Sequence, residues 1–292
     1  MPELPEVETV KKQLETCIMH KPIIQVIAYS PKLRYPITIP QKQEIITKIY
    51  RRSKYIICEL NSNKYLILHL GMTGFFQYIK YDSEYAKLDK LKHTHVDIYF
   101  EDGVLRYIDP RRFGAMIYTD NLNHTALNKL GPEPLDMSID ELGQHLFNSS
   151  KKRKQPIKLF ITNNEIIVVI GNIYACEVLF ESHINPQTVC SEISLEHYKI
   201  MAQHIQSILH NAIKYGGSTI DNFTHLHIYE KHENANIINQ DEENMLQNKG
   251  YFQIQHKVYG KQNNECTKCK NLITKIVQGQ RSTYFCQNCQ VI

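Results

Sequence analysis

Residues 266–289 read CTKCKNLITKIVQGQRSTYFCQNC, and the two cysteine pairs in this stretch determine how it folds. Two Cys-x2-Cys motifs enclose the 16 residues 270–285, the arrangement that places four thiolates tetrahedrally around one structural Zn²⁺. The alternative is a set of four unligated thiols. We therefore predict a zinc ribbon that holds one ion through Cys266, Cys269, Cys286 and Cys289 and exposes Arg281 near the tip of its hairpin.

The composition of the whole chain is that of a folded protein rather than a disordered, secreted or membrane-spanning one. The chain has 292 residues, 42% of them hydrophobic and 22% charged, which suffices for one or two cores. No apolar run approaches the roughly 20 residues needed to span a bilayer, and the acidic start is unlike a signal peptide. The other four cysteines are scattered among apolar residues, so we expect buried, reduced thiols in a cytoplasmic protein without a membrane partner. The net charge of +4 permits a nucleic-acid partner without requiring one.

The apolar pattern divides the chain into four parts and predicts an α+β fold. A helix over residues 3–20 and a series of short β-type runs predict a sandwich or barrel in a first domain, residues 2–120. The rigid Gly-Pro-Glu-Pro at 131–134 leads to a helical domain, residues 132–224, which is followed by a polar loop, residues 225–250, and the zinc module, residues 251–292. The predicted strands are 23–29, 55–60, 65–70, 75–79, 96–100, 104–108 and 115–118, and the later helices are 138–147, 157–162, 173–182 and 194–215.

Three segments are candidate contacts with nucleic acid. Residues 109–114, DPRRFG, place two arginines beside a phenylalanine between predicted strands. Arginine can bond phosphates or base edges and phenylalanine can wedge into a base stack, although a solvated loop explains the segment equally well. For the basic run 151–154 the competing interpretation is a solvated face. Residues 69–74, HLGMTG, put Met72 between glycines, where a core residue is not expected, so Met72 is a second candidate wedge.

The start of the chain, Met1-Pro2-Glu3, offers a nucleophile and an acid. A small second residue permits removal of Met1, which leaves Pro2 with a secondary amine whose pKa of about 8 makes it a usable nucleophile at neutral pH. When such an amine attacks a sugar C1′, the product is a cationic iminium that acidifies the C2′ proton and so couples base release to strand cleavage. Glu3 is the candidate general acid or base. Taken alone, Met-Pro-Glu is an ordinary beginning.

Ten motifs follow one another from the start of the chain to its end. They are MPELPEVET at 1–9, RSKY at 52–55, HLGMTG at 69–74, DPRRFG at 109–114, GPEP at 131–134, GNIYA at 171–175, GGST at 216–219, GYF at 250–252, VYG at 258–260 and the zinc ribbon. Any one of them could occur by chance, whereas ten in order are specific. The chain thereby resembles bacterial formamidopyrimidine-DNA glycosylase over essentially its whole length.

The resemblance implies a fold, an activity and a set of site residues. The implied fold is an N-terminal β-sandwich with flanking helices, a helix-two-turn-helix domain and a C-terminal zinc ribbon. The implied activity is base excision repair by a monomer on double-stranded DNA that carries oxidised bases or abasic sites: oxidised purines, such as 8-oxoguanine and formamidopyrimidines, are excised and the strand is cleaved by β,δ-elimination. By position, Pro2 is the Schiff-base nucleophile, Glu3 the proton donor for base release, and Lys54 and Arg281 the proton donors for β- and δ-elimination. The implied DNA contacts are His69, Met72, His93, Arg111, Phe113, Arg153, Asn172 and Tyr259, of which Met72, Arg111 and Phe113 fill the space left by a flipped nucleotide.

The sequence departs from the family pattern at three places. Val169 stands where the family usually has glycine, and Asp221 replaces the usual basic residue in the loop that covers the flipped base. Residues 224–249, 26 positions, replace a much shorter link. The two loop changes leave the preference among lesions open.

Three rival functions are weighed against this one. An endonuclease VIII-type glycosylase for oxidised pyrimidines is the closest, and Leu4 together with the 109–113 loop favours the purine branch instead. A zinc-ribbon DNA-binding protein without catalysis is disfavoured because Pro2, Glu3 and Lys54 are all present. A metallohydrolase is disfavoured because the 14 histidines show no HExxH spacing.

Overall fold

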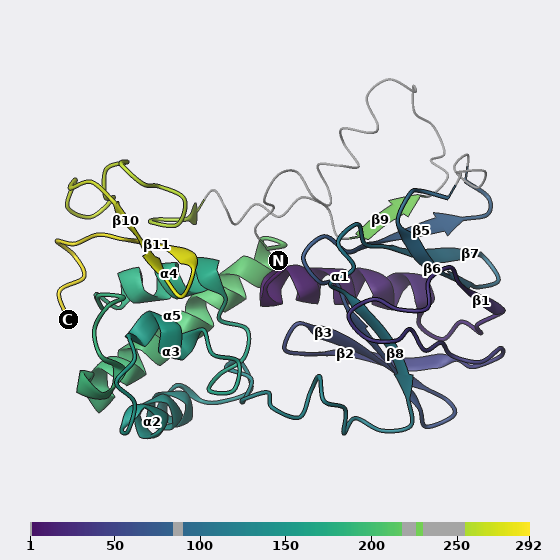
Figure 1. Cartoon of the computed structure of the whole chain (residues 1–292), viewed down its shortest axis with the longest axis horizontal. Helices are drawn as coiled ribbons and strands as arrows, with labels where there is room; N and C mark the ends of the chain where they lie inside the picture. Colours follow the sequence, from purple (N-terminus) through teal and green to yellow (C-terminus); the bar gives the residue numbers. More distant parts are fainter. Residues whose placement is uncertain (1, 84–89, 218–225, 230–254) are drawn as a thin grey trace. The chain divides into compact units, whose positions relative to one another are not determined.

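The chain forms two compact units in the computed structural model, which describes residues 2–83, 90–217, 226–229 and 255–292 (Figure 1). Unit 1 comprises Met1–Leu127 and Gly216–Tyr251, and unit 2 comprises Asn128–Tyr215 and Phe252–Ile292. No helix among the described residues is long and apolar enough to cross a membrane.

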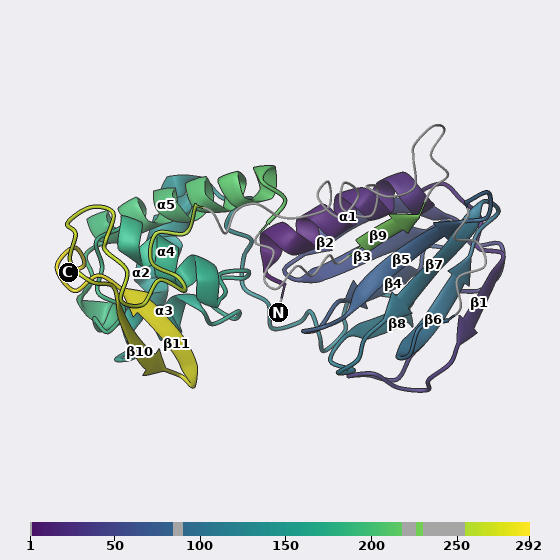
Figure 2. The same ribbon diagram turned by 90° about the horizontal axis from the view of Figure 1, so that it is seen from above.

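Unit 1 is a β-sandwich with one long helix, α1 (Leu4–Ile18). One sheet has the order β1-β6-β7-β5-β9 and the other β2-β3-β4-β8 (Figure 2). Among the described strands every pairing is antiparallel except that of β5 with β9. The strands are β1 (Gln25–Ala28), β2 (Ile46–Arg52), β3 (Tyr55–Leu60), β4 (Tyr65–His69), β5 (Phe75–Lys80), β6 (Thr94–Tyr99), β7 (Gly103–Ile108), β8 (Ala115–Thr119) and β9 (Leu226–Tyr229).

The core of unit 1 lies between the two sheets and α1. The helix contributes a stripe of apolar residues at helical spacing, including Val7, Val10 and Leu14, which are at most 2% exposed. Both sheets and α1 supply residues to one continuous cluster that includes Ile56 and Phe76. This packing holds the strand ends and turns that carry the candidate site in fixed places.

The predicted α+β sandwich is confirmed, with two additions. Strand β2 was not predicted, because a bulge between Ile46 and Lys48 breaks the alternation of buried and exposed residues that marks a strand. Strand β9 lies within the range that we predicted to be a polar loop, 225–250, and pairs in parallel with β5. Four residues of that range are therefore sheet rather than loop, and residues 225 and 230–250 lie outside the described part of the chain.

Unit 2 combines the helices of the predicted second domain with the predicted zinc module. Helices α2 and α5 begin after Ser138 and Ser194, whose hydroxyl oxygens accept backbone N–H groups in the first turn of each helix. Helix α4 is buried from Ile173 to Phe180, and it packs on both α5 and the ribbon strand β11. The elements are α2 (Ile139–Ser150), α3 (Ile157–Ile161), α4 (Asn172–Glu181), the short 3-10 helix η2 (Cys190–Glu192), α5 (Leu195–Lys214), β10 (Thr274–Gln278) and β11 (Arg281–Phe285).

Candidate functional site

The candidate nucleophile and acid lie at the buried start of α1. Pro2 is buried, and Glu3, 5% exposed, is the N-cap residue of the helix. Glu3 and Glu6 form a reciprocal capping box, in which the backbone N–H of Glu3 donates to Oε2 of Glu6 at 2.8 Å. The backbone next to Pro2 is therefore fixed by the helix that follows it.

Glu6 also contacts the glycine pair that follows α5. Gly217 has a φ of +84°, which only glycine adopts readily, and a Cβ placed on it would lie 2.7 Å from Oε1 of Glu6. The pair thus meets the helix start at the last described residue before the segment 218–225. Asp221 belongs to that segment and lies outside the described residues.

Lys54 occupies the two-residue turn between β2 and β3. Arg52 pairs with Tyr55 across the hairpin, and Ser53 adopts a φ of +56° that closes the turn. Despite its place in a turn, Lys54 is only 7% exposed. The hairpin therefore packs the side chain of Lys54 against the protein rather than exposing it to bulk water.

His69, at the end of β4, is a buried neutral imidazole in the neighbourhood of Lys54. Burial, together with the positive charges of Arg34 and Lys54, lowers the pKa of His69 to about 4. Its Nδ1 accepts the backbone N–H of Gly71 at 3.1 Å, and its ring packs on Tyr55 with centroids 4.6 Å apart. Two charged donors, Lys54 and Arg34, and the neutral ring of His69 thus come together from three separate parts of the chain.

The three candidate wedge residues project from two adjoining loops of unit 1. Met72 is 41% exposed and Phe113 46% exposed, and both loops meet through backbone, since a Cβ on Gly71 would lie 2.5 Å from the backbone nitrogen of Gly114. Gly71 has a φ of +70°. The guanidinium of Arg111 lies 4.9 Å from the centroid of the Phe113 ring. Exposed apolar side chains held on a tight backbone are suited to insertion between stacked bases.

Asp109 holds these two loops together and is fully buried. Its Oδ1 accepts the hydroxyl of Thr73 at 2.7 Å and the backbone N–H of Arg111 at 3.2 Å. Its Oδ2 accepts the backbone N–H of Gly114 at 2.8 Å. The backbone N–H of Asp109 donates to the carbonyl of His93, an exposed residue with a φ of +69°. One carboxylate therefore ties the Met72 loop, the 109–114 loop and the His93 backbone together.

The four ribbon cysteines form the cluster that the sequence predicts. Their sulfur atoms all lie within 4.8 Å of one another, with Cys266 and Cys289 at 3.8 Å and Cys269 and Cys286 at 3.4 Å. A tetrahedral Zn²⁺ with bonds of about 2.3 Å requires sulfur separations of about 3.8 Å. Hydrogen bonding, first of all from the backbone of Asn271, lowers the pKa of Cys269, whereas burial raises the pKa of Cys286 and of Cys289. The donor set and its spacing fit a zinc ion.

Asn172, at the start of α4, connects the helices to the ribbon hairpin. Its Oδ1 accepts the ammonium of Lys158 at 2.6 Å, and its amide donates to the backbone carbonyl of Ser282 at 2.9 Å. Lys158 is 1% exposed. Ser282 directly follows Arg281, which is exposed at the start of β11, so the buried lysine and the asparagine fix the backbone beside this arginine.

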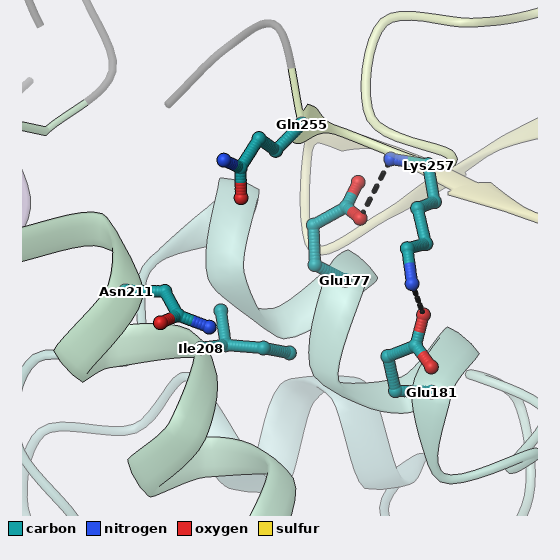
Figure 3. Close-up of a pocket in the computed structure, with 6 residues that line it drawn as sticks. All are labelled: Glu177, Glu181, Ile208, Asn211, Gln255 and Lys257. Carbon is teal, nitrogen blue, oxygen red and sulfur yellow. Dashed lines mark hydrogen bonds and ion pairs between the residues drawn. The ribbon is translucent and has the colours of Figure 1, made fainter. Parts of the chain in front are cut away.

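Tyr259 is held by a second polar anchor on α4. The carboxylate of Glu177 accepts the backbone N–H groups of Lys257, Val258 and Tyr259 at 2.8, 3.1 and 2.8 Å. Figure 3 shows Glu177 directed at the backbone of Lys257, on the wall of a small pocket. The ring of Tyr259 packs edge-on against Tyr284 of β11, 5.2 Å between centroids.

Arg153 lies just after α2 and is exposed, with its Nε donating to the carbonyl of Ser149 at 3.0 Å. The candidate residues are thus divided between the units. Unit 1 carries Pro2, Glu3, Lys54, His69, Met72, His93, Arg111 and Phe113, and unit 2 carries Arg153, Asn172, Tyr259, Arg281 and the four cysteines.

The sequence patterns do not identify Lys158, Glu177 or the buried role of Asp109. A signal for the first two was present, because each is a charged residue inside an otherwise apolar helical run, IKLFI or NIYACEVLFE. A charge in such a run must be paired when it is buried. The partners of Lys158 and Glu177 are 14 to 82 residues distant along the chain, so the sequence does not show which groups these charges bind.

Val169, where the sequence departs from the family pattern, is buried and has a φ of +71°. This region of backbone space is costly for a β-branched residue and open to glycine. The departure therefore places a strained valine two residues before Gly171, the N-cap residue of α4.

Three family models match successive parts of the chain. They are the formamidopyrimidine-DNA glycosylase N-terminal domain over residues 1–116, the formamidopyrimidine-DNA glycosylase H2TH domain over 130–224, and the zinc finger found in FPG and IleRS over 264–291.

Curated relatives and solved structures match the chain over its full length. A formamidopyrimidine-DNA glycosylase of Ruthia magnifica subsp. Calyptogena magnifica is 38% identical, covering 99% of this chain and 100% of the relative. A Lactococcus lactis FPG mutant bound to DNA containing Fapy-dG has a TM-score of 0.81 at 30% identity, with 100% of both chains covered. A MutM structure in complex with DNA containing carbocyclic 8-oxo-G has a TM-score of 0.81 at 32% identity, again with 100% of both chains covered.

Proposed function

Because the chain belongs to the formamidopyrimidine-DNA glycosylase family of DNA repair enzymes, we propose that it excises oxidised purines and then cleaves the strand by β,δ-elimination. The proposed substrates are 8-oxoguanine and formamidopyrimidines in double-stranded DNA, and abasic sites. Solved complexes of relatives support a DNA substrate with a damaged base: they contain Fapy-dG DNA, 8-oxo-G DNA and, for the wild-type Lactococcus lactis FPG, DNA with an oxidised pyrimidine. The choice of purines rests on Leu4 and the 109–113 loop. The proposed enzyme acts as a cytoplasmic monomer.

The observation that carries the proposal is the buried Pro2-Glu3 pair at the start of α1, in the same unit as the exposed wedge loops. A nucleophilic secondary amine needs a fixed backbone and a nearby acid, which the capping box of Glu3 and Glu6 supports. An amine and an acid held side by side support catalysis over DNA binding alone.

The proposed chemistry begins at the amine of Pro2. Its nitrogen bonds to C1′ of the damaged nucleotide as the bond from C1′ to the base breaks, and Glu3 supplies the proton that base release requires. The C1′–O4′ bond of the sugar then opens as the proton of the attacking nitrogen passes to O4′, which leaves a cationic iminium. The iminium acidifies the C2′ proton, whose loss expels the 3′ phosphate with Lys54 as proton donor. A second elimination expels the 5′ phosphate with Arg281 as proton donor. Hydrolysis of the Schiff base then returns the amine of Pro2.

Base access follows from the wedge loops. A base inside a duplex is out of reach, and flipping it costs a few kcal/mol of stacking and pairing. We propose that Met72, Arg111 and Phe113 offset this cost by filling the vacated space. Their exposure and the shared Asp109 anchor support that role. His69, His93, Arg153, Asn172 and Tyr259 are the further proposed contacts with DNA.

A structural zinc ion is proposed to be held by Cys266, Cys269, Cys286 and Cys289. When bound, the ion supplies cohesion to a short segment that has little core of its own, and four protein ligands leave no position for catalysis. The cysteines serve to present the hairpin with Arg281.

The decisive experiment is borohydride trapping followed by peptide mapping. The protein is incubated with an 8-oxoguanine duplex, reduced, digested and sequenced by mass spectrometry. We expect the cross-link on the amine of Pro2 in a chain that has lost Met1. A cross-link found only on a lysine side chain, such as Lys54, contradicts the proposal. A Pro2→Gly variant is not a suitable control because glycine also offers an amine, so Glu3→Gln, expected to bind the duplex without releasing the base, serves instead.

A parallel arm tests the rival substrate class. A duplex with thymine glycol, an oxidised pyrimidine, is compared with the 8-oxoguanine duplex at equal enzyme concentration. We expect faster excision from the purine lesion. Excision that is faster from thymine glycol would favour the endonuclease VIII-type function.

A further inference from the structure

Helix α4 ends in an arrangement of charges that the proposed function does not use. Glu181 is the last residue of the helix, where the negative end of the helix dipole disfavours a carboxylate. It is nevertheless an ion-pair centre: its Oε1 lies 2.6 Å from Nζ of Lys257, and its Oε2 lies 3.3 Å from Nζ of Lys268. These two lysines together lower the pKa of Glu181, although its partial burial alone would raise it. Figure 3 shows the pair of Glu181 with Lys257 beside Glu177.

Lys268 connects this carboxylate to the first zinc knuckle. It lies between Cys266 and Cys269, and its Nζ lies 4.9 Å from the centroid of the Phe180 ring of α4. The same Nζ is 3.3 Å from Nε2 of His183. An ammonium can only donate, so Nε2 accepts this hydrogen bond.

His183 extends the contacts to the second knuckle. Its Nδ1 lies 2.9 Å from the backbone carbonyl of Cys289, which can only accept, so Nδ1 donates this hydrogen bond. His183 follows the end of α4 with a φ of +59°, a position that favours glycine. The histidine therefore occupies a strained place from which its side chain reaches both knuckles.

We propose that Glu181, His183 and Lys268 form a bracket that fixes both zinc knuckles to the end of α4 and slows the loss of the ion. Lys257 joins the bracket to the segment that carries Tyr259. These residues are positioning residues, since none of them offers a ligand atom to the four-cysteine cluster. The inference rests on the proposal that the cysteines bind zinc.

The bracket acts on the backbone of the knuckles rather than on the sulfur atoms. A Cys-x2-Cys knuckle opens when its backbone departs from the turn that aims both thiolates at the ion. Lys268 is in the middle of one such turn, and the Cys289 carbonyl belongs to the last residue of the other. Outer contacts of this kind change metal affinity by roughly 10- to 100-fold in other sites.

The test is the rate of zinc release into excess EDTA, followed with a colorimetric zinc dye. We expect Glu181→Gln and His183→Gly to release zinc on the order of tenfold faster than the parent protein. Asp140→Asn is the matched control. Asp140 of α2 pairs with Lys199 of α5 at 2.7 Å in the same unit, and the substitution breaks this ion pair without touching the bracket. The control should release zinc at the parent rate.

His183→Gly separates the bracket from general stability. Glycine suits the positive φ, so we expect the thermal unfolding temperature to be unchanged or raised while zinc release is faster. Glu181→Asp, which keeps the charge, should restore part of the retention that Glu181→Gln loses.

Release rates of Glu181→Gln and His183→Gly within twofold of the parent rate would overturn the bracket. Purified protein without zinc by elemental analysis would overturn the zinc proposal itself, so the two failures are distinguishable.

Discussion

The two units fix their candidate site residues by different means. In unit 1 the loops with Met72 and Phe113 are attached to a sandwich whose core runs continuously from α1 through both sheets. In unit 2 the ribbon that carries Arg281 shares only a small core with α4, and ribbon cysteines form part of that core. Polar contacts add to its attachment, among them those of Asn172, Glu177 and Glu181. Burial of apolar area therefore stabilises the site loops of unit 1, whereas the ribbon of unit 2 depends on its cysteine ligands and on polar contacts.

The largest test of this difference is removal of one ribbon cysteine. Cys286→Ser should lose the zinc ion, because a structural site needs all four ligands, and the ribbon should unfold since zinc supplies on the order of 10 kcal/mol to such modules. We expect amide hydrogen exchange in residues 264–292 to become fast while residues 46–80 keep their protection. DNA affinity should fall with it.

The comparison would be wrong if both units lost protection together. A zinc-free protein that still cleaved abasic DNA at the parent rate would likewise show that the ribbon does not need its ion. Cys17→Ser, a change at a buried cysteine of α1, is the control for loss of a thiol as such, and it should leave zinc content unaltered.

A second test concerns the polar anchor of unit 1. Asp109→Asn leaves one carboxamide oxygen where two carboxylate oxygens accept the hydroxyl of Thr73 and the N–H of Gly114. The amide group then faces another donor, so we expect a loss of about 2–3 kcal/mol in the free energy of unfolding by urea. Asp120→Asn, whose 3.5 Å pair with Lys64 is solvated, should cost less than about 0.5 kcal/mol.

Equal losses for the two variants would contradict the anchor. Asp109→Asn should also weaken insertion of the wedge residues into DNA, measured as the fluorescence of 2-aminopurine placed beside the lesion. This readout separates the loop geometry from the stability of the sandwich.

These residues show what the sequence could and could not predict. The zinc cluster, α1 and most strands follow from spacing and periodicity, which are local. Strand β2 escaped prediction because its bulge breaks the alternation, and β9 because a short edge strand has no local signal. The role of Asp109 was hidden for another reason: its partner Thr73 is 36 residues away, and only the folded sandwich brings the two loops together.

Acid should weaken unit 1 through His69. The pKa of this imidazole is 6.5 in an unfolded chain and about 4 in the fold, because burial and nearby positive charge oppose protonation. Protons therefore favour the unfolded chain, so the stabilisation is complete above about pH 6.5 and declines as the pH falls toward 4. At pH 5 the loss should be roughly 2 kcal/mol relative to pH 7.

The measurement is the urea midpoint at pH 7 and pH 5 for the parent and for His69→Asn, which keeps a hydrogen-bond acceptor for Gly71. The variant should be less stable at pH 7 and lose less on acidification. An identical pH dependence in both proteins would exclude His69 as its source.

The smallest expected effect is the difference in stability between Val169→Ala and Val169→Gly, and its sign shows whether Val169 stores backbone strain. In unit 2 this buried residue holds a φ of +71° before α4, so its backbone carries strain while its side chain contributes to the core. Val169→Ala removes two methyl groups and keeps the strain, whereas Val169→Gly removes slightly more and relieves it. Because a positive φ costs a residue with a Cβ about 1–2 kcal/mol, and glycine costs about 0.5–1 kcal/mol in chain entropy, the glycine variant should be the more stable by about 0.5–1 kcal/mol. This order reverses the usual one, in which alanine is better tolerated than glycine.

Thermal unfolding of the two Val169 variants side by side measures this difference. Val168→Ala and Val168→Gly are the control pair, since Val168 is equally buried and is not among the residues with positive φ. There alanine should be the more stable, and the same order at both positions would mean that Val169 stores no backbone strain.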